Sequence, residues 1–572
     1  MSTNSGQRSV RGGRWPAGVL SATLAGVTAA ALTAAPALAA TSTTIVKTTT
    51  TSNGTTTTTT TTTTSSGTTS TTGFTVVSST TAPGAQNRWL VDSTLTSLHD
   101  VTNSVGAPAV WAKKDAAGRS LTGQGVGVAL IDSGIAPVKG LSQAGKVING
   151  PDLSFESQAS NLRNLDTFGH GTHMAGIIAG RDADTPVGRE NDPKFFVGMA
   201  PDARMVNLRV AGADGAVDVS QIIAAIDWAI THRNDAGVNI RVINLSFGTD
   251  SLQDPKYDPL SYAVEAAWRA GIVVVVSVGN DGPTDTRVGN PALNPYVIAV
   301  GGADTAGTIS PADDKIGAFS TRGDATRHAD LVAPGRSVVS LRDPGAFVDV
   351  NYPGGLVQDS TGRYFKGSGS SQAAAVVSGA VALLLQQRPA LTPDQVKKLL
   401  TSTAKPLAGV DVIGQGAGEL DLMAASMAAT PTSATQSFTK ALGTGTLEGA
   451  RGTAHVTDPE TLIDLTGERD IMGAAWNPAV WTVDSAAGKA WSGGTWNGNV
   501  WAGTSWTGTS WTSQTWSPYL WTARTWSGSS WTARTWSSAG WTAGSWSART
   551  WSARTWSART WSGGYWASRT WQ

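Results

Sequence analysis

Three short motifs in a fixed order constrain this chain of 572 residues more than any other feature. They read Asp-Ser-Gly at 132–134, Gly-His-Gly-Thr-His at 169–173 and Gly-Ser-Ser-Gln-Ala-Ala-Ala at 369–375. Together they supply a carboxylate, an imidazole and a hydroxyl. A serine hydroxyl attacks a carbonyl only when an imidazole takes its proton and an acid orients that imidazole. The motifs therefore indicate nucleophilic catalysis by a serine.

The residues around each motif predict where its side chain lies. Residues 126–132 form an apolar run that ends in an acid, which predicts a buried parallel strand with Asp132 at the carboxyl edge of a sheet. Small and apolar residues follow His170 and Ser371, which predicts a buried helix at each position. Because the first N–H groups of a helix are unpaired, the helix that begins near Ser371 can help to bind a developing oxyanion.

The region between these motifs alternates between two kinds of pattern. Residues 204–210, 241–247, 272–279 and 297–301 predict buried strands, and residues 219–232 and 259–270 predict helices between them. This alternation favours an α/β fold, a parallel sheet with helices on both faces. In such sheets the site lies beyond the carboxyl ends of the strands, where Asp132, Ser246 and Asn280 fall. Thr392 to Gln395 is a capping box that begins a helix over 393–402.

The motifs and their order resemble those of the subtilases, the subtilisin-like serine proteases. The resemblance covers roughly residues 101–428, and the segments at 198–203, 242–248, 278–282 and 331–335 support it. It implies that Asp132 orients His170, that His170 is the general base and acid, and that Ser371 is the nucleophile. Asn280 matches the amide of the oxyanion hole. The chain departs from the usual family pattern at three positions, with Ser370 for Thr, Gln372 for Met and Ala375 for Pro.

The resemblance also implies a substrate pocket. Its walls would be Ser246, Phe247 and Gly248 on one side and Ser277, Val278 and Gly279 on the other, with Gly289 at the floor; Gly215, Ala216 and Val217 would pair with the substrate backbone by strand addition. Glycine at the floor leaves room and no charge, so we expect large apolar side chains before the cleaved bond. No cofactor is required, and calcium is the structural ion that the resemblance would allow. Asp182, Asp184 and Asp192 lie in a loop where subtilases sometimes hold calcium, although solvated loop charge is the simpler interpretation.

The N-terminal region predicts export. Residues 1–39 combine Arg8, Arg11 and Arg14 with an Ala-rich apolar stretch and a small-residue cleavage site at 37–39, as in a signal peptide. Residues 40–97 are rich in Thr and Ser and hold too few apolar residues for a core, which predicts a disordered spacer. The chain has no cysteine, which is compatible with an exported bacterial protein. We expect a secreted protein with no stable membrane insertion after signal cleavage.

The C-terminal region is a repeat. We expect a catalytic domain over 98–428, a linker over 429–475 and a tail over 476–572 in which Trp recurs every five residues except at Ala486. A period of five fits neither one face of a helix nor one face of a strand, and a coil of stacked repeats is one alternative. The tail carries seven basic side chains against one acid, and nineteen of the 24 Trp. Charge and ring stacking suit a cell-wall polymer or glycan, whereas a self-packed spacer is the other interpretation.

Two classes of function remain open at this point. The first is a secreted serine endopeptidase, associated with the cell wall if the tail binds there, that acts on protein or peptide substrates through an acyl-enzyme. The second is a surface- or glycan-binding protein on an inactive subtilase scaffold. The net charge of +1 does not point to nucleic acid.

Overall fold

The computed structural model describes residues 43–52, 55–64, 69–76, 96–154, 156–157, 162–453, 455–456 and 464–500. It divides into two units, residues 1–85 and 86–572. The predicted signal peptide and the tail after residue 500 lie outside the described residues.

The first unit is a three-stranded antiparallel sheet of β1 (Thr43–Ser52), β2 (Thr55–Thr64) and β3 (Thr69–Val76). Most of its cross-strand pairs join two threonines, as in Thr49↔Thr58. Thr is branched at Cβ, and β-branched residues favour extended backbone. These strands fall within residues 40–97, and the prediction of a disordered spacer there is not tested.

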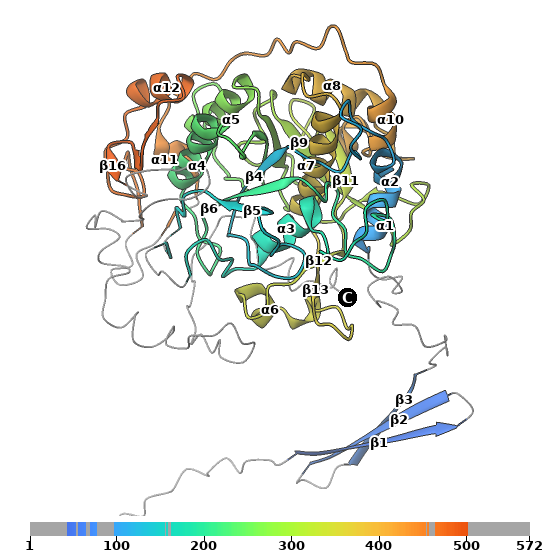
Figure 1. The fold of residues 1–572 in the computed structure, drawn as a ribbon. Coiled ribbons are helices and arrows are strands. Elements are labelled where there is room, and N and C mark those ends of the chain that lie inside the picture. The colour runs from blue at the N-terminus through green and yellow to red at the C-terminus, as the bar shows by residue number, and fades with distance from the viewer. Residues whose placement is uncertain are drawn as a thin grey trace, which may run out of the picture. The chain divides into compact units, whose positions relative to one another are not determined.

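The second unit is built on an eight-stranded sheet (Figure 1). Its strands are β4 (Gly127–Asp132), β5 (Val147–Asn149), β6 (Arg204–Arg209), β7 (Ile240–Leu245), β8 (Val273–Ser277), β9 (Ile298–Asp304), β10 (Lys315–Ile316) and β11 (Leu331–Pro334). The order is β10-β9-β8-β7-β4-β6-β5, and β11 also pairs with β9. Only β10 is antiparallel to its neighbour among these described strands. All residues of β4 and β8 are buried, as expected for strands covered on both faces.

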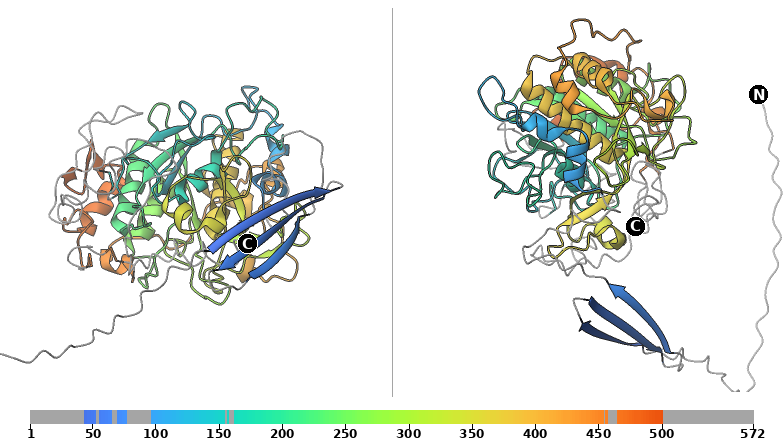
Figure 2. Two further views of the ribbon diagram at one scale, coloured as in Figure 1. Left: turned by 90° about the horizontal axis from the view of Figure 1, so that it is seen from below. Right: turned by 90° about the vertical axis from the view of Figure 1, so that its right-hand side faces the viewer.

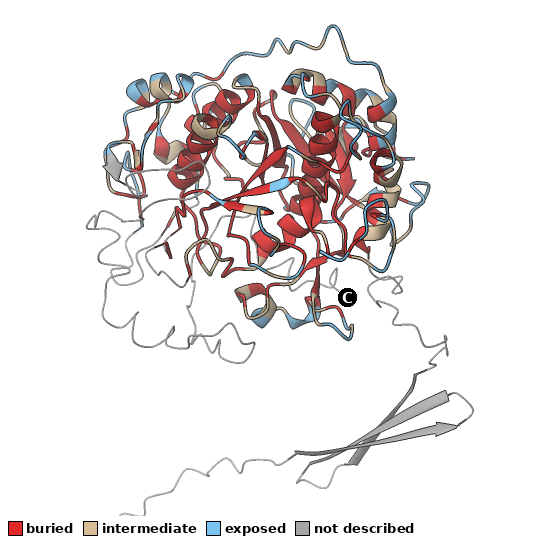
Figure 3. Cartoon of the chain, viewed as in Figure 1, coloured by how far each residue is buried: buried red, intermediate tan, exposed pale blue. Residues whose placement is uncertain are grey.

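Two pairs of helices cover this sheet. α3 (His170–Ala179) packs against α7 (Ser370–Gln387), and α4 (Val219–His232) packs against α5 (Pro259–Arg269). Each pair contacts both β4 and β8, and Figure 1 shows α4 and α5 on one side of the strands and α3 and α7 on the other. The buried residues are concentrated in the sheet and in these helices (Figure 3). The α/β prediction is therefore confirmed, with one antiparallel edge strand added.

Shorter elements complete the unit. They are α1 (Leu98–Ser104), α2 (Ala107–Trp111), β12 (Val338–Leu341), α6 (Phe347–Asn351), η2 (Pro353–Gly355), β13 (Tyr364–Gly367), α8 (Pro393–Thr403), α9 (Val412–Gln415) and α10 (Leu422–Met427). The capping box of Thr392 and Gln395 begins α8 as predicted. Among the described helices, none is both long enough and apolar enough to cross a membrane.

The described elements between residues 447 and 500 pack against the helices that cover the sheet. The elements are α11 (Leu447–Arg451), α12 (Pro478–Ala486) and a meander of two-residue strands, β14 (Trp491–Ser492), β15 (Thr495–Trp496) and β16 (Asn499–Val500). α11 contacts α4 and α5, α12 contacts α5, and β14 contacts α4 (Figures 1 and 2). Part of the segment that we expect to be a linker, and the first repeats of the tail, therefore share a core with the sheet.

Buried indoles hold the first repeats in place. Trp481 Nε1 and Trp496 Nε1 both donate to Asp227 Oδ2 on α4, over 2.8 and 2.9 Å. Ser485 Oγ donates to Asp227 Oδ1, and Trp491 Nε1 donates to the carbonyl of Ala224. A tryptophan has a large apolar surface and one N–H donor. Its burial is therefore favourable where α4 supplies a hydrogen-bond acceptor for that N–H group.

Candidate active site

Asp132 and His170 are in direct contact where β4 ends and α3 begins. Asp132 is the last residue of β4, and His170 is the first residue of α3. His170 Nδ1 lies 2.9 Å from Asp132 Oδ1 and 3.0 Å from Oδ2, and both side chains are almost fully buried. Because a carboxylate can only accept, the proton sits on Nδ1 and Nε2 keeps its lone pair. The imidazole is therefore held in the tautomer that a general base requires.

Close approach of strand and helix depends on Gly171. A Cβ at this position would lie 2.1 Å from the carbonyl oxygen of Gly134 and 3.0 Å from Asp132 Oδ1. Any larger residue would push the start of α3 away from the end of β4. The glycine in the second motif thus brings His170 within reach of Asp132.

Ser371 is the second residue of α7, and the residue before it, Ser370, contacts Asn280, which follows β8. Ser370 N donates to Asn280 Oδ1 over 2.8 Å, and Ser370 Oγ donates to the carbonyl of Gly279 over 2.9 Å. Since Asn280 Oδ1 faces this backbone N–H, the amide is fixed with Nδ2 as its remaining donor. Within the described part of the chain, Nδ2 donates to no protein group, and it lies 3.3 Å from where a Cβ on Gly369 would sit. An amide donor is therefore held next to the nucleophile candidate.

His173 is a second buried imidazole on α3, one turn after His170. Its Nε2 lies 3.1 Å from the carbonyl oxygen of Phe365. Burial, together with the charge of a protonated His170, lowers its pKa to about 3. His173 therefore stays neutral and does not compete with His170 for a proton at neutral pH.

The residues expected to bind substrate separate into two groups. Gly248, Gly279 and Gly289 line one cavity of about 760 Å³ together with Val288. At Gly289 the three atoms closest to a Cβ would be backbone atoms of Gly248, Thr249 and Val278, the nearest at 3.7 Å. The cavity is thus lined by backbone at Gly289, and the role of this glycine as the floor of a substrate pocket stays a prediction.

The other expected substrate residues do not line this cavity. Ser246, Phe247, Ser277 and Val278 are buried behind it in β8 or just after β7 and β8. Gly215, Ala216 and Val217 belong to a turned segment closed by the bond from Gly212 N to the carbonyl of Ala216. That segment is not part of a strand in the structure. Its pairing with a substrate backbone stays a prediction.

Sequence reasoning missed several residues of the cavity. Four come from the segment after the expected catalytic domain, namely Glu448, Gly449, Gly452 and Thr453. Others follow β7 and β8, including Asp250, Gln253, Asp281, Asp285 and Arg287. The segment is held by side chains of the β7–α5 loop, since Thr249 Oγ1 donates to the carbonyl of Ala450 and Ser251 Oγ to that of Gly449. No motif in residues 429–475 predicts that this segment lines the cavity.

The three acids considered for calcium each lie beside a cation. Asp182 pairs with Arg363, Asp192 with Arg189, and Asp184 with Lys139 at 3.9 Å. Among the described residues, no group of three or more His, Cys, Asp or Glu side chains is arranged to hold a metal ion. Calcium as a structural ion stays a prediction.

Comparison with known proteins places this geometry in a family. The model of the subtilase family of peptidases matches residues 123–445. Serine protease AprX of Bacillus subtilis (strain 168) is 36% identical over 310 residues, which span 53% of this chain and 66% of AprX. Subtilisin DY of Bacillus licheniformis is 32% identical over 314 residues, which span 54% of this chain and 94% of that protein.

A solved structure of a cold adapted subtilisin-like serine proteinase is also similar. It has 27% sequence identity and a TM-score of 0.39, and the match covers 52% of this chain and 89% of that one. The assignment rests on the sequence matches, since the family model spans more than half of the chain. The chain therefore belongs to the subtilase family of serine-type endopeptidases.

Proposed function

We propose that this protein is a secreted endopeptidase that hydrolyses peptide bonds through Asp132, His170 and Ser371. The observation that carries the proposal is the buried contact of His170 Nδ1 with Asp132, which leaves Nε2 as a base. His170 Nε2 takes the proton of Ser371 Oγ as that oxygen attacks the scissile carbonyl. The same imidazole then protonates the leaving amine, and an acyl-enzyme remains on Ser371.

Asn280 and the start of α7 would stabilise the negative charge that develops during this attack. Asn280 Nδ2 is the donor left over once Ser370 N–H holds Oδ1. The first N–H groups of α7 have no carbonyl partner within the helix. Donors fixed in advance toward a developing oxyanion lower the barrier because they do not have to reorganise.

The proposed specificity follows from the floor at Gly289. Backbone atoms surround it, so a large apolar side chain fits before the cleaved bond. The same cavity also contains the acids Asp250, Asp281, Asp285 and Glu448. Cleavage of a peptide library shows whether the apolar floor or the acidic side chains determine the residue preferred before the cleaved bond. Preference for Phe, Leu or Met supports the apolar floor, whereas preference for Lys or Arg would contradict it and point to the acids.

Retention at the cell wall is the proposed role of the tail. Trp476, Trp481, Trp491 and Trp496 are buried against the protein itself, so they are not free to bind a polymer. The proposal therefore concerns residues after 500, where six of the seven basic side chains of the tail occur. Charge attraction and ring stacking on a glycan support it.

A serine-directed fluorophosphonate probe tests the catalytic proposal against an inactive scaffold. The native protein should be labelled at Ser371 and should cleave casein. Ser371→Ala removes one oxygen, so it should keep the fold and lose both properties. A native protein that is folded but unlabelled and inactive would favour the surface-binding alternative. Cleavage by Ser371→Ala at the native rate would overturn the assignment of the nucleophile.

A further inference from the structure

The start of α3, which carries His170, has no capping side chain of its own. Its N-cap is Gly169, in the left-handed region with φ of 104°. The unpaired N–H groups are satisfied from elsewhere: Asp166 Oδ1 accepts from Gly169 N and Asp166 Oδ2 accepts from Thr172 N, each over 2.6 Å. A third N–H, that of Gly171, donates to Ser133 Oγ over 2.9 Å. Two side chains thus fix the helix end that holds the general base.

Ser133 connects this helix end to the acid of the site. Its backbone N donates to Asp132 Oδ1 over 2.7 Å. Its Oγ lies 2.8 Å from Asp166 Oδ1 and 3.2 Å from Asp132 Oδ1. A hydroxyl has one proton to donate, and the shorter distance assigns that proton to Asp166. Ser133 therefore bridges Asp166, the start of α3 and Asp132 at once, and all of these groups are buried.

We infer that Asp166 and Ser133 are positioning residues for the reaction, which set His170 against Asp132 without touching the substrate. This inference rests on the proposed function. Asp166 fixes the start of α3 along and around its axis, and Ser133 fixes the same helix end relative to the carboxylate of Asp132. The contact between His170 and Asp132 depends on both restraints, because the imidazole is carried on the first residue of the helix.

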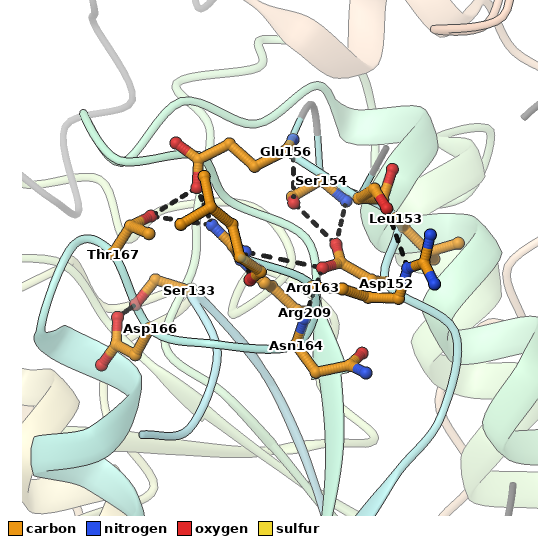
Figure 4. Close-up of polar contacts among 12 residues, drawn as sticks. Ser133, Asp152, Leu153, Ser154, Glu156, Arg163, Asn164, Asp166, Thr167 and Arg209 are labelled. Atoms are coloured by element: carbon orange, nitrogen blue, oxygen red, sulfur yellow. Dashed lines mark hydrogen bonds and ion pairs between the residues drawn. The ribbon is translucent and has the colours of Figure 1, made fainter. Parts of the chain in front are cut away.

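A second network holds Thr167, the residue after Asp166 (Figure 4). Thr167 donates from Oγ1 to Glu156 Oε2 over 2.6 Å and accepts from Arg209 Nη2 over 2.7 Å. Arg209 also pairs with Glu156, and its side chain has no exposed surface. Arg209 is the register partner of Asp132 in the pairing of β6 with β4. The loop that carries Asp166 is thus anchored to the strand beside the one that carries the catalytic acid.

The expected effect of losing these restraints follows from the geometry of the reaction. A misplacement of about 1 Å at a reacting group can cost about 100-fold in rate. Asp166→Asn keeps the size of the side chain but replaces one accepting oxygen with an NH₂ group that cannot accept from a backbone N–H. Ser133→Ala removes the bridging hydroxyl and leaves the backbone bond to Asp132. Ser133→Thr keeps the hydroxyl.

The test is the kinetics of a short chromogenic peptide and the rate of fluorophosphonate labelling. We expect Asp166→Asn and Ser133→Ala to lower kcat by about 10- to 100-fold, with KM within about twofold of native, because neither residue contacts the substrate. The labelling rate of Ser371 should fall by a similar factor. Ser133→Thr should retain most of the activity.

Asp421→Asn is the matched control for a merely structural effect. Asp421 is likewise an aspartate at the start of a helix, α10, where it accepts from Ala424 N over 2.8 Å and pairs with Lys405. Neither of these side-chain contacts reaches α3 or Asp132. The variant should lower the melting temperature and leave kcat near the native value.

The inference is overturned if Asp166→Asn and Ser133→Ala are folded and keep native kcat and labelling rate, or if Asp421→Asn loses as much kcat as they do. If Asp166→Asn does not fold, Ser133→Ala, which removes a single oxygen, decides the outcome. Failure of the proposed function would instead be seen in the native protein, which would neither be labelled nor cleave the peptide.

Discussion

Arg451 Nε lies 2.6 Å from Asp218 Oδ2, and neither side chain is exposed to solvent. Asp218 is also the N-cap of α4, where it accepts from Ser220 N. Arg451 is on α11, more than 230 residues later in the chain. A buried ion pair therefore joins the segment after the expected catalytic domain to a helix on the sheet.

Arg451→Ala should destabilise the protein strongly, because it leaves Asp218 buried without its cation. Removing one partner of a buried pair costs about 3–5 kcal/mol. Urea denaturation of the variant measures this loss. The matched control is Arg322→Ala, since Arg322 and its partner Asp411 are both exposed and solvent screens such a pair, so that it contributes little to stability. Equal losses in the two variants would show that the pair of Arg451 and Asp218 is not a structural link.

Asn280→Ala should lower kcat and leave KM nearly unchanged, because the amide donor acts on charge that develops only in the transition state. Loss of one oxyanion donor costs about 100- to 1000-fold in kcat, the magnitude known for subtilisin itself. Steady-state kinetics on a peptide substrate provide the measurement. A variant that raises KM and keeps kcat would place Asn280 in ground-state binding instead.

Trp496→Phe should destabilise the protein more at neutral pH than in acid. Burial raises the pKa of Asp227 to about 6, despite hydrogen bonds from Ser485, Trp481 and Trp496 that lower it. A raised pKa means that the stability contributed by this group is full below about pH 4 and is lost as pH rises through about 6. Removing the N–H of Trp496 leaves the ionised carboxylate with one donor fewer, so the loss grows once Asp227 is ionised.

Thermal unfolding of Trp496→Phe at pH 4.5 and pH 7.5 checks this expectation. We expect a loss of about 1–3 kcal/mol at the higher pH and a smaller loss at the lower one. Trp491→Phe is the control, because Trp491 Nε1 donates to the neutral carbonyl of Ala224 and its loss should not depend on pH. The same pH dependence in both variants would contradict the role of Asp227.

Glu419→Gln should stabilise the protein in mild alkali. Burial and the neighbouring carboxyl of Asp314 raise the pKa of Glu419 to about 9. The folded protein therefore keeps a proton there that the unfolded chain releases above about pH 4.5, so stability falls as pH rises from about 4.5 to 9. Glutamine is neutral at every pH and escapes this loss. The melting temperature should rise by a few degrees at pH 8 and change little at pH 4.5; a drop at pH 8 would show that the charged form is stabilised.

Truncation after Val500 should separate retention from catalysis. Small-peptide cleavage should stay near native, while retention on isolated cell walls should fall, and retention of the full chain should weaken with salt because part of the attraction is screened charge. Truncation after Ala475 is the contrasting variant, since it also removes the buried Trp481, Trp491 and Trp496 and should lower the melting temperature. Equal retention of the full chain and the Val500 truncation would leave the tail as a spacer.

The family and most of the helices and strands of its domain could be predicted from the amino-acid sequence alone. β4 ends at Asp132 and α4 covers 219–232, as predicted. Buried strands and capped helices can be predicted because each depends on a pattern of a few neighbouring residues. The contact of His170 with Asp132 could be expected for the same reason, since each motif combines the reacting side chain with the glycines that allow close approach.

The distant residues that support the candidate site became apparent from the folded chain. Nothing local marks Asp166 as the acceptor for the N–H groups at the start of α3, Arg209 as the anchor beside it, or Arg451 as the partner of Asp218. The repeat of Trp every five residues matches no helix or strand period, yet its first members are buried because α4 presents Asp227 and the carbonyl of Ala224 to their N–H groups. A buried N–H group needs a hydrogen-bond acceptor, and here another part of the chain supplies it. The periodicity of one segment cannot predict where that acceptor lies.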